Sequence, residues 1–212
     1  MVMTQLASSV TLRHERRGQD AYFSIDIETD GPIPGDYSML AIGIVEAGHH
    51  DGKRFVGSDL PNEQYLELKP IGSKFDRDAL TVNGLDRDRL SVEGRDPAEA
   101  MVELDEWVSE RASGRRPVMV ASPAGFDWMF VHWYFEHFTG RSPFGHSSLF
   151  DIKTAIAVRF DRPVALSGRQ NVPRWLKSAL PHSHNALDDA REQAQLFHNI
   201  MSWRGLTTRA DF

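Results

Sequence analysis

The stretch YFSIDIETDGP, residues 22–32, joins the pattern of a buried strand to a row of acidic residues. Positions 22 to 27 are apolar and β-branched enough to predict a strand. Asp26 nevertheless lies inside this strand, and Glu28 and Asp30 follow it at every second position. Alternate side chains of a strand point to one face, so the three carboxylates would crowd one side, and burying an unpaired carboxylate is costly. The rest of the sequence must supply a reason for this arrangement.

The composition is that of an ordinary globular protein. The chain has 212 residues, of which 41% are hydrophobic and 25% charged. This length suits one domain with extensions. We expect a folded domain over residues 20–205, an N-terminal extension over residues 1–19 and a C-terminal tail over residues 206–212.

Cysteine is absent from the chain. Its absence excludes disulfides, thiol catalysis and thiolate metal sites, and it fits the cytoplasmic localisation that we expect. The chain has no run of apolar residues long enough for a transmembrane helix, and its start lacks the apolar segment of a signal peptide. We therefore expect no membrane partner.

The formal net charge of −6 argues against a broad electrostatic surface for nucleic acid. An acidic protein can still act on a polyanion where bound cations neutralise the point of contact. Local basic clusters remain, and scattered solvated charge is the simpler interpretation of each. They are Arg13, Arg16 and Arg17; Arg111, Arg115 and Arg116; and Arg169, Arg174 and Lys177.

Alternating and apolar runs predict strands mainly in the first third of the chain. They cover residues 20–27, 37–48, 52–57 with 63–70, and 116–122. Gly48 is expected to end the second strand, and residues 58–62 to interrupt the third. Short connections favour antiparallel pairing of these first three strands.

The clearest helix begins at Asp96, which is a candidate N-cap. Pro97 suits the first helical position, Glu99 completes a capping box, and Gly114 ends the helix. Further helices are predicted over residues 126–138, 149–160, 172–180 and 185–205. A strand meander followed by alternating helices and strands predicts an α/β fold, with a mixed sheet flanked by helices.

Acidic residues occupy four places where core residues would be expected. Each has a structural explanation: a strand end that faces water, a helix cap, or an acid in the first turn of a helix. The histidines of the fourth place could be surface loop residues. The four places are Asp26 with Glu28; Asp127 in GFDWMF; Asp151 in LFDIKTAIA; and His182, His184, Asp188 and Asp189 in HSHNALDDA.

Taken together, these acids favour a metal site. Mg²⁺ and Mn²⁺ prefer hard oxygen ligands such as carboxylates. Two such ions about 3.5–4 Å apart need a shared carboxylate and several neighbours, and can hold both oxygens of a phosphodiester in line. The reaction also needs a base for the attacking water, and histidine suits that task near neutral pH.

Three of these motifs resemble those of the DEDDh 3′–5′ exonucleases, the group of ribonuclease T, oligoribonuclease and the proofreading subunit of bacterial DNA polymerase III. SIDIETDGP is similar to the first exonuclease motif and AGFDWMF to the second. HNALDDA is similar to the third, in which His184 precedes Asp189 by five residues. LFDIKTAIA is similar to the Asp-led helix between the second and third motifs. The resemblance spans about residues 20–203.

The resemblance implies a ribonuclease H-like fold and a two-metal mechanism with two Mg²⁺ or Mn²⁺ ions. It implies that Asp26 bridges both ions, and that Glu28 and Asp189 bind the first. Asp127 would bind the second and His184 would deprotonate the attacking water. The product would be a nucleoside 5′-monophosphate released from a 3′ end. Main-chain groups near Thr29 and the side chain of Met39 are weaker candidates for substrate contacts, with core packing as the alternative for Met39.

The sequence departs from the family pattern at two positions. Many relatives have Asn four residues before the second-motif acid, where this chain has Pro123, which puts one substrate contact in doubt. Asp30 follows the Glu-Thr pair where relatives often have Thr or Gly. We interpret Asp30 as a turn residue before Gly31 rather than as a further acid of the site.

Two other functions compete with this one. A zinc hydrolase could use His182-x-His184, but positions 186 and 187 break the metallo-β-lactamase pattern, and Asp26 would be unexplained. A non-catalytic module on the same fold, binding nucleic acid or protein, is the main alternative. Such modules usually lack one acid or the histidine, and all five residues are present here.

The motifs do not separate DNA from RNA, which depends on contacts to the 2′-hydroxyl and on stacking surfaces. The lack of a broad basic face favours single-stranded or short 3′ ends as the partner. Several relatives form dimers, so a homodimer is compatible with the resemblance, although no sequence feature marks an interface.

Overall fold

The computed structural model describes residues 18–58 and 62–205. Within these residues one sheet has the strand order β3-β2-β1-β5-β6, and β4 also pairs with β2. Its strands are β1 (Asp20–Thr29), β2 (Met39–His50), β3 (Phe55–Gly57), β4 (Glu63–Glu67), β5 (Arg116–Ala121) and β6 (Leu149–Asp151). β1 is antiparallel to β2 and parallel to β5. The predicted mixed sheet with an antiparallel first part is therefore confirmed.

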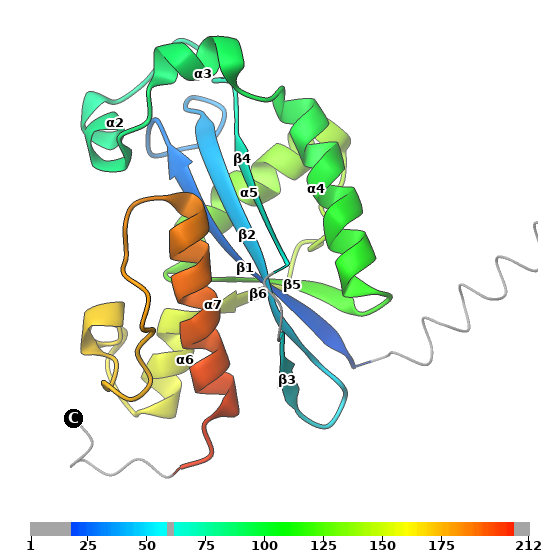
Figure 1. Cartoon of the computed structure of the whole chain (residues 1–212), viewed down its shortest axis with the longest axis vertical. Coiled ribbons are helices and arrows are strands. Elements are labelled where there is room, and N and C mark those ends of the chain that lie inside the picture. Colours follow the sequence, from blue (N-terminus) through cyan, green and yellow to red (C-terminus); the bar gives the residue numbers. More distant parts are fainter. Residues whose placement is uncertain (1–17, 59–61, 206–212) are drawn as a thin grey trace, which may run out of the picture.

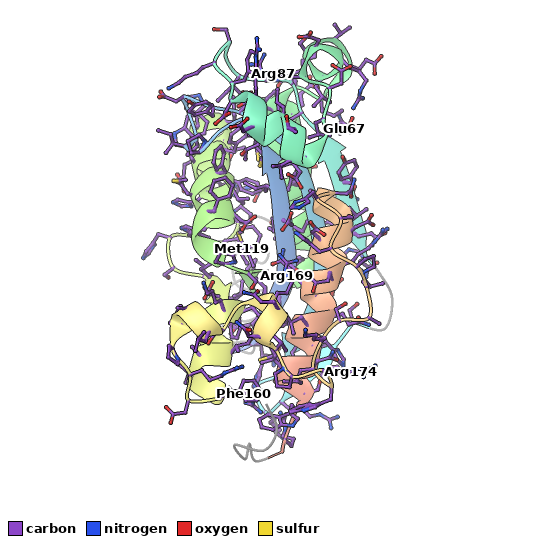
Figure 2. The ribbon with its side chains drawn as sticks, turned by 90° about the vertical axis from the view of Figure 1, so that its left-hand side faces the viewer. Glu67, Arg87, Met119, Phe160, Arg169 and Arg174 are labelled. Atoms are coloured by element: carbon purple, nitrogen blue, oxygen red, sulfur yellow. The ribbon has the colours of Figure 1, made fainter. Side chains whose placement is uncertain are left out.

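Helices cover both faces of the sheet (Figure 1). They are α2 (Arg77–Asn83), α3 (Arg87–Glu93), α4 (Pro97–Ala112), α5 (Ala124–Thr139), α6 (Ile152–Arg159) and α7 (Ala186–Ser202), with short 3₁₀ turns η1 (Val164–Leu166) and η2 (Arg169–Asn171). α7 lies along one face of β1 and β2, and α4 packs with α5 on the opposite face (Figures 1 and 2). α2 and α3 lie together at one end of the molecule (Figure 1).

The alternation of side chains along β1 divides the interior into two cores. Phe23, Ile25 and Ile27 pack in a cluster with residues of α4 and α5. Tyr22 packs in a second cluster with Phe197 and other residues of α6 and α7. The even-numbered residues of β1 therefore face α7, as the period of two predicts.

The predicted capping of α4 is confirmed in detail. The Asp96 side chain accepts hydrogen bonds from the backbone N–H groups of Ala98 and Glu99, and Pro97 is the first helical residue. α7 likewise begins after Asn185, whose side chain accepts from the N–H groups of Leu187 and Asp188. Both helix starts are set by local chemistry that the sequence shows.

Three of the predicted strand and helix assignments are wrong. Gly48 does not end the second strand: it lies in β2 at an irregularity in the pairing with Tyr22, with φ at 138°, a backbone conformation open to glycine. The predicted interruption of the third strand is confirmed, because β3 ends at Gly57 and β4 begins at Glu63, and both parts pair with β2. Residues 149–151 pair with β5 as β6 before α6 begins. Residues 172–180 form turns rather than a helix.

α2 and α3 were not predicted. Each begins at an aspartate whose side chain caps it, Asp76 for α2 and Asp86 for α3, and each is followed by a glycine. These signals were present in the sequence. The helices have seven residues each, and only Leu90 among their residues is buried, so they show almost no apolar stripe to detect.

The predicted extensions lie mostly outside the described residues, which exclude residues 1–17 and 206–212. The basic cluster of Arg13, Arg16 and Arg17 lies there as well. Within residues 18–58 and 62–205, none of the helices is both long and apolar enough to span a bilayer.

Candidate active site

The acids of β1 face the N-terminal half of α7. Asp26 and Glu28 continue the row of Tyr22, on the side of the strand that α7 covers. The register with β2 then shifts between Glu28 and Thr29, where the strand ends. Two carboxylates rather than three thus remain on this face.

A glycine on the neighbouring strand allows α7 to come close to these acids. Gly43 pairs with Asp26 across β1 and β2. A Cβ atom at this position would lie 2.3 Å from the Ala186 carbonyl oxygen in the first turn of α7. Any larger residue would therefore push the helix away from the sheet.

This close approach brings a third carboxylate to the pair. Asp189, in the first turn of α7, is 1% exposed. Ligand oxygens of Asp26, Glu28 and Asp189 all lie within 4.8 Å of one another. Acids from opposite ends of the sequence therefore form one cluster.

Asp127 approaches the same cluster from α5. It lies in the first turn of that helix and is 8% exposed. Its charge raises the pKa of both Asp26 and Glu28, so it lies close enough to interact with each. Four acids from three elements therefore share one electrostatic environment.

Asp151, in contrast, has a structural role. One of its carboxylate oxygens accepts a hydrogen bond from the Ala124 N–H at 2.7 Å, and the other accepts from the Thr154 N–H at 2.6 Å. It thus caps α5 and α6 together. The cap of α5 is needed because Pro123, which precedes that helix, makes no side-chain cap hydrogen bond.

Three of the acids, Asp26, Glu28 and Asp127, resist ionisation in the folded protein. Burial, followed by the charges of Asp127, Asp189 and Glu28, raises the pKa of Asp26 well above its usual range. Burial and the charges of Asp189 and Asp127 raise the pKa of Glu28 to about 8. Burial also raises the pKa of Asp127 to about 7, although its own N–H and that of Ile27 oppose this. Bound cations would remove this repulsion.

The donor set fits divalent cations of the hard type. Asp26, Glu28, Asp127 and Asp189 offer only carboxylate oxygens, which Mg²⁺ and Mn²⁺ prefer. The mutual repulsion of these acids is the expected state of a cluster that binds positive charge.

A histidine loop enters the site just ahead of α7. The Asp189 carboxylate accepts hydrogen bonds from the Ser183 N–H at 2.9 Å and the His184 N–H at 3.1 Å. His184 adopts a left-handed conformation with φ of 56°, which is rare for a non-glycine residue. Its side chain is exposed. The loop therefore holds the His184 backbone at the edge of the acid cluster and leaves its ring accessible.

His182, which is not one of the motif residues, also contacts the acid cluster. Its Nδ1 atom is 2.7 Å from an Asp189 carboxylate oxygen, and its ring is 4.5 Å from that of His184. Ligand atoms of these three residues also lie within 4.8 Å of one another. Two potential ligand groups therefore share Asp189.

Arg169 is a cation of the site that the motifs did not identify. It lies on η2, and its positive charge partly offsets the rise in the pKa values of Asp26 and Asp127. Its Nη1 atom donates to Glu192 at 2.6 Å and lies 2.9 Å from His182 Nδ1. Glu192 is 5% exposed, so it anchors the guanidinium from α7. Figure 2 shows Arg169 beside α7 near the middle of the molecule. The sequence marked Arg169 only as part of a basic cluster.

Gln193 was not identified at all. It lies on α7 and is 1% exposed, and its Nε2 atom donates to Asp26 Oδ1 at 2.7 Å. It lies one helical turn after Asp189, on the same helix face. That spacing was a usable signal, because it directs a polar residue toward the acids.

The two predicted substrate contacts are engaged within the protein. The Thr29 hydroxyl donates to the Gly31 carbonyl at 2.9 Å, and the Thr29 carbonyl accepts from Asn83 at 3.0 Å. The Met39 side chain is fully buried in the core, and its N–H donates to the Tyr134 hydroxyl at 2.6 Å. This burial favours the packing role for Met39 over the predicted nucleotide contact.

Asp30 is a structural residue, in keeping with its interpretation as a turn residue. It is fully buried, and its carboxylate accepts from the Ser38 N–H and, at 2.8 Å, from Arg87 Nε. Its carbonyl accepts from the Asp76 N–H at 2.7 Å. Asp30 thus ties the β1–β2 loop to α2 and α3.

Comparison with known proteins identifies a relative of nearly the same length. The chain is 36% identical over 187 residues to the 3′–5′ DNA exonuclease Cap18 of Escherichia coli, and the match covers 87% of this chain and 94% of that protein. No family model matches the chain.

Solved structures show the same fold at low sequence identity. The nuclease domain of 3′hExo, a DEDDh family member bound to rAMP, superposes with a TM-score of 0.63 at 11% identity, covering 86% of this chain and 91% of that one. Escherichia coli exonuclease I in complex with a dT13 oligonucleotide gives a TM-score of 0.58 at 12% identity, covering 87% of this chain and 41% of that one. Pop2p of S. pombe, in a form with Mg²⁺ and Mn²⁺ bound, gives 0.56 at 14% identity, covering 93% and 88%. These similarities confirm the predicted ribonuclease H-like fold.

Proposed function

The chain belongs to the DEDDh-type family of 3′–5′ exonucleases and is an enzyme that acts on nucleic acid, and from this starting point we propose its substrate, its cofactors and the roles of its residues. We propose that it removes nucleoside 5′-monophosphates from the 3′ end of single-stranded nucleic acid. Two divalent cations, Mg²⁺ or Mn²⁺, would serve as cofactors. His184 would act as the general base.

The observation that carries this proposal is the convergence of the acids. Asp26, Glu28 and Asp189 have ligand oxygens within 4.8 Å of one another, and Asp127 interacts with the first two. In the metal-free protein these acids repel one another, so the fold has positioned them at a cost to its own stability. Such a cost is understandable where the cluster binds cations for catalysis.

The four carboxylates would hold the cations. When bound, the cations supply positive charge that stabilises the charge developing on the phosphate during hydrolysis. By holding the cations in place, the acids would set the position at which the scissile phosphate binds relative to the attacking water.

His184 would take the proton from that water. Its ring is exposed at the edge of the acid cluster, and two hydrogen bonds to Asp189 fix the loop from which it projects. The water oxygen would form a bond to phosphorus, and the bond from phosphorus to the 3′ oxygen would break. The released nucleotide keeps the phosphate on its 5′ side, and the leaving 3′ oxygen takes up a proton, so the shortened strand ends in a 3′-hydroxyl.

DNA is the first substrate to test, because the relative at 36% identity is named a DNA exonuclease. A single strand is favoured because exonuclease I of the same fold is seen with an oligonucleotide of thymidines, and because the net charge of −6 disfavours a long duplex. The alternative of a non-catalytic module is not supported, since the chain carries all four acids and the histidine.

The test uses single-stranded DNA and RNA of one sequence, labelled at the 5′ or the 3′ end. With Mg²⁺ or Mn²⁺, we expect a ladder of shortened products from the 5′-labelled strand and a labelled mononucleotide from the 3′-labelled strand. The Asp26→Ala variant should abolish both products and remain folded by circular dichroism. Full activity of a cleanly purified Asp26→Ala protein would overturn the assignment, and comparison of the two sugars settles the preference.

A further inference from the structure

Aromatic side chains gather where α6 ends, at the C-terminal end of α7. The ring of Trp175 lies 5.2 Å from that of Trp203, and both rings lie near Phe160, at 6.4 and 5.5 Å. Trp175 is 48% exposed, although its size would favour burial. The protein therefore presents an aromatic face to solvent at this end.

One basic side chain contacts these rings, and three more are their neighbours in the chain. The Arg159 guanidinium lies 4.8 Å from the centre of the Trp203 ring. Arg174, Lys177 and Arg204 are close to the two tryptophans in the chain. We call the six residues that form this patch the aromatic–basic surface: Arg159, Arg174, Trp175, Lys177, Trp203 and Arg204.

The positive charge of this surface is not neutralised by acids. Arg159 and Arg204 donate to the Trp203 carbonyl, and Lys177 donates to the Gln170 carbonyl at 3.1 Å. None of the four cations forms an ion pair with a carboxylate among residues 18–58 and 62–205. Asp161 is an exposed acid in the same stretch. Several cations elsewhere do form ion pairs, as Arg87 does with Asp30.

The surface lies within reach of the active site along one helix. Trp203 follows Asp189 by 14 residues, at the end of α7, which at 1.5 Å per residue corresponds to about 20 Å. A stacked strand advances about 3.4 Å per nucleotide, so this span corresponds to roughly six nucleotides. A short stretch of chain also joins the active site to this surface. Arg169 lies beside the acids, and the carbonyl of the next residue, Gln170, accepts a hydrogen bond from Lys177. In Figure 2, Phe160 and Arg174 lie below Arg169.

The opposite side of the molecule is unsuited to a polyanion. α4 lies on the other face of the sheet (Figure 1). Its residues Glu99, Glu106 and Glu110 are exposed. Charge complementarity therefore favours the aromatic–basic surface as the path of a bound strand.

We propose that the aromatic–basic surface binds the 5′-ward part of the single strand whose 3′ end occupies the active site. This inference rests on the proposed function. Bases would stack on Trp175, which tolerates any sequence, and the cations would contact phosphates. The surface would thus hold longer strands on the enzyme between successive cleavages. The enzyme would therefore prefer longer single strands to very short oligonucleotides.

The test compares a single strand of about twelve nucleotides with a trinucleotide that cannot reach the surface. For Trp175→Ala, we expect kcat/KM on the long strand to fall about tenfold through KM, with kcat/KM on the trinucleotide unchanged. The double variant Arg174→Gln/Arg204→Gln should lower the salt dependence of long-strand binding, by about 0.7 in logarithmic slope for each phosphate that the variant no longer binds. Arg111→Gln, on α4, is the matched control and should behave as wild type.

Other outcomes overturn the proposal. Equal losses on both substrates would indicate damage to the active site or the fold, and no loss on the long strand would exclude the path. A change in oligomeric state by light scattering with unchanged strand binding would assign the surface to contacts between copies of the chain. Should wild type cleave nothing, anisotropy of labelled single strands in EDTA still tests this surface: weaker binding of the variants supports it and equal binding excludes it, independently of the proposed function.

Discussion

Gln193 on α7 donates a hydrogen bond from Nε2 to Oδ1 of Asp26 on β1, at 2.7 Å. The two residues are 167 positions apart in the sequence. Gln193 is 1% exposed, and its Oε1 atom has no hydrogen-bond partner among the described residues. The bond fixes the rotation of the Asp26 carboxylate and leaves its Oδ2 atom free for a cation.

Gln193→Leu is expected to weaken cation binding about tenfold or more, because residues that orient metal ligands typically contribute that much to affinity. The measurement is Mn²⁺ titration followed by electron paramagnetic resonance, which does not depend on activity. Gln193→Glu preserves the shape but adds a carboxylate beside Asp26, and it should destabilise the metal-free protein. Unchanged Mn²⁺ affinity in Gln193→Leu would leave Gln193 with a packing role only.

The stability of the metal-free protein should fall as the pH rises from about 4.5 to 8. The pKa of Glu28 is raised to about 8 and that of Asp127 to about 7, and that of Asp26 is raised as well. In this window the folded protein therefore binds more protons than the unfolded chain, so raising the pH favours unfolding. The measurement is Tm in EDTA across this range.

Asp26→Asn should make this decline shallower, since it removes one of the repelling carboxylates. Saturating Mg²⁺ or Mn²⁺ should raise Tm most at the alkaline end, where the acids are ionised. A metal concentration of 100 times Kd corresponds to about 2.7 kcal/mol of stabilisation. A Tm that rises with pH in EDTA would contradict the repulsion described for this site.

His184→Ala should lower kcat by about 10²- to 10⁴-fold, the usual contribution of a general base. Its Mn²⁺ affinity should stay near that of wild type if the ring acts on the water rather than as a ligand. His182→Ala is the matched control, because His182 lies two residues away and contacts Asp189 at 2.7 Å. A larger loss of kcat in His182→Ala than in His184→Ala would transfer the role of base to His182.

Arg169→Gln should affect substrate and metal in opposite directions. Arg169 lowers the pKa values of Asp26 and Asp127, so it adds positive potential to the site. Its loss should raise KM for the anionic strand while leaving Mn²⁺ affinity equal or higher. Because Glu192 is buried and would lose its partner, the variant is best made together with Glu192→Gln. Parallel losses of both affinities would point to a distorted site instead.

Arg87→Ala should destabilise the protein by about 3–5 kcal/mol, as expected when one partner of a buried ion pair is removed. Asp30 is fully buried and would lose the cation with which it pairs. Urea unfolding measures the loss. Lys74→Ala breaks the exposed ion pair with Asp36 and should have no measurable effect. A small loss in Arg87→Ala would show that the carboxyl of Asp30 is satisfied by the Ser38 N–H alone.

Much of the framework could be predicted from local patterns. The period of two along residues 22–28 predicted which side chains share a face, and the structure confirms it for Tyr22 and Phe23. The N-cap of α4 at Asp96 and the helical spacing of α7 could also be predicted, because both depend on residues that are neighbours in the chain. The short helices α2 and α3 were not predicted, because they bury almost no side chains and so lack an apolar stripe.

The spacing of the acids alone did not separate structural acids from those of the site, although Asp30 was correctly interpreted as a turn residue. Asp30 continues the spacing of Asp26 and Glu28, yet it turns away to Arg87, because the register shifts at the end of β1. Asp151 leads a segment similar to the helix between the second and third motifs, and both its oxygens cap helices. The spacing of residues predicts the face to which a side chain points only as long as the strand or helix continues.

The sequence by itself determined the mixed α/β fold, the acids available to the site and the family, because these follow from periodicity and from motifs within short segments. Only the tertiary structure decided which polar groups meet them. Arg169, Gln193 and His182 reach the acids because α7 packs closely over Gly43 and brings its own loop with it. Such contacts join residues far apart in the chain, and their distances depend on packing between elements, which no local pattern encodes.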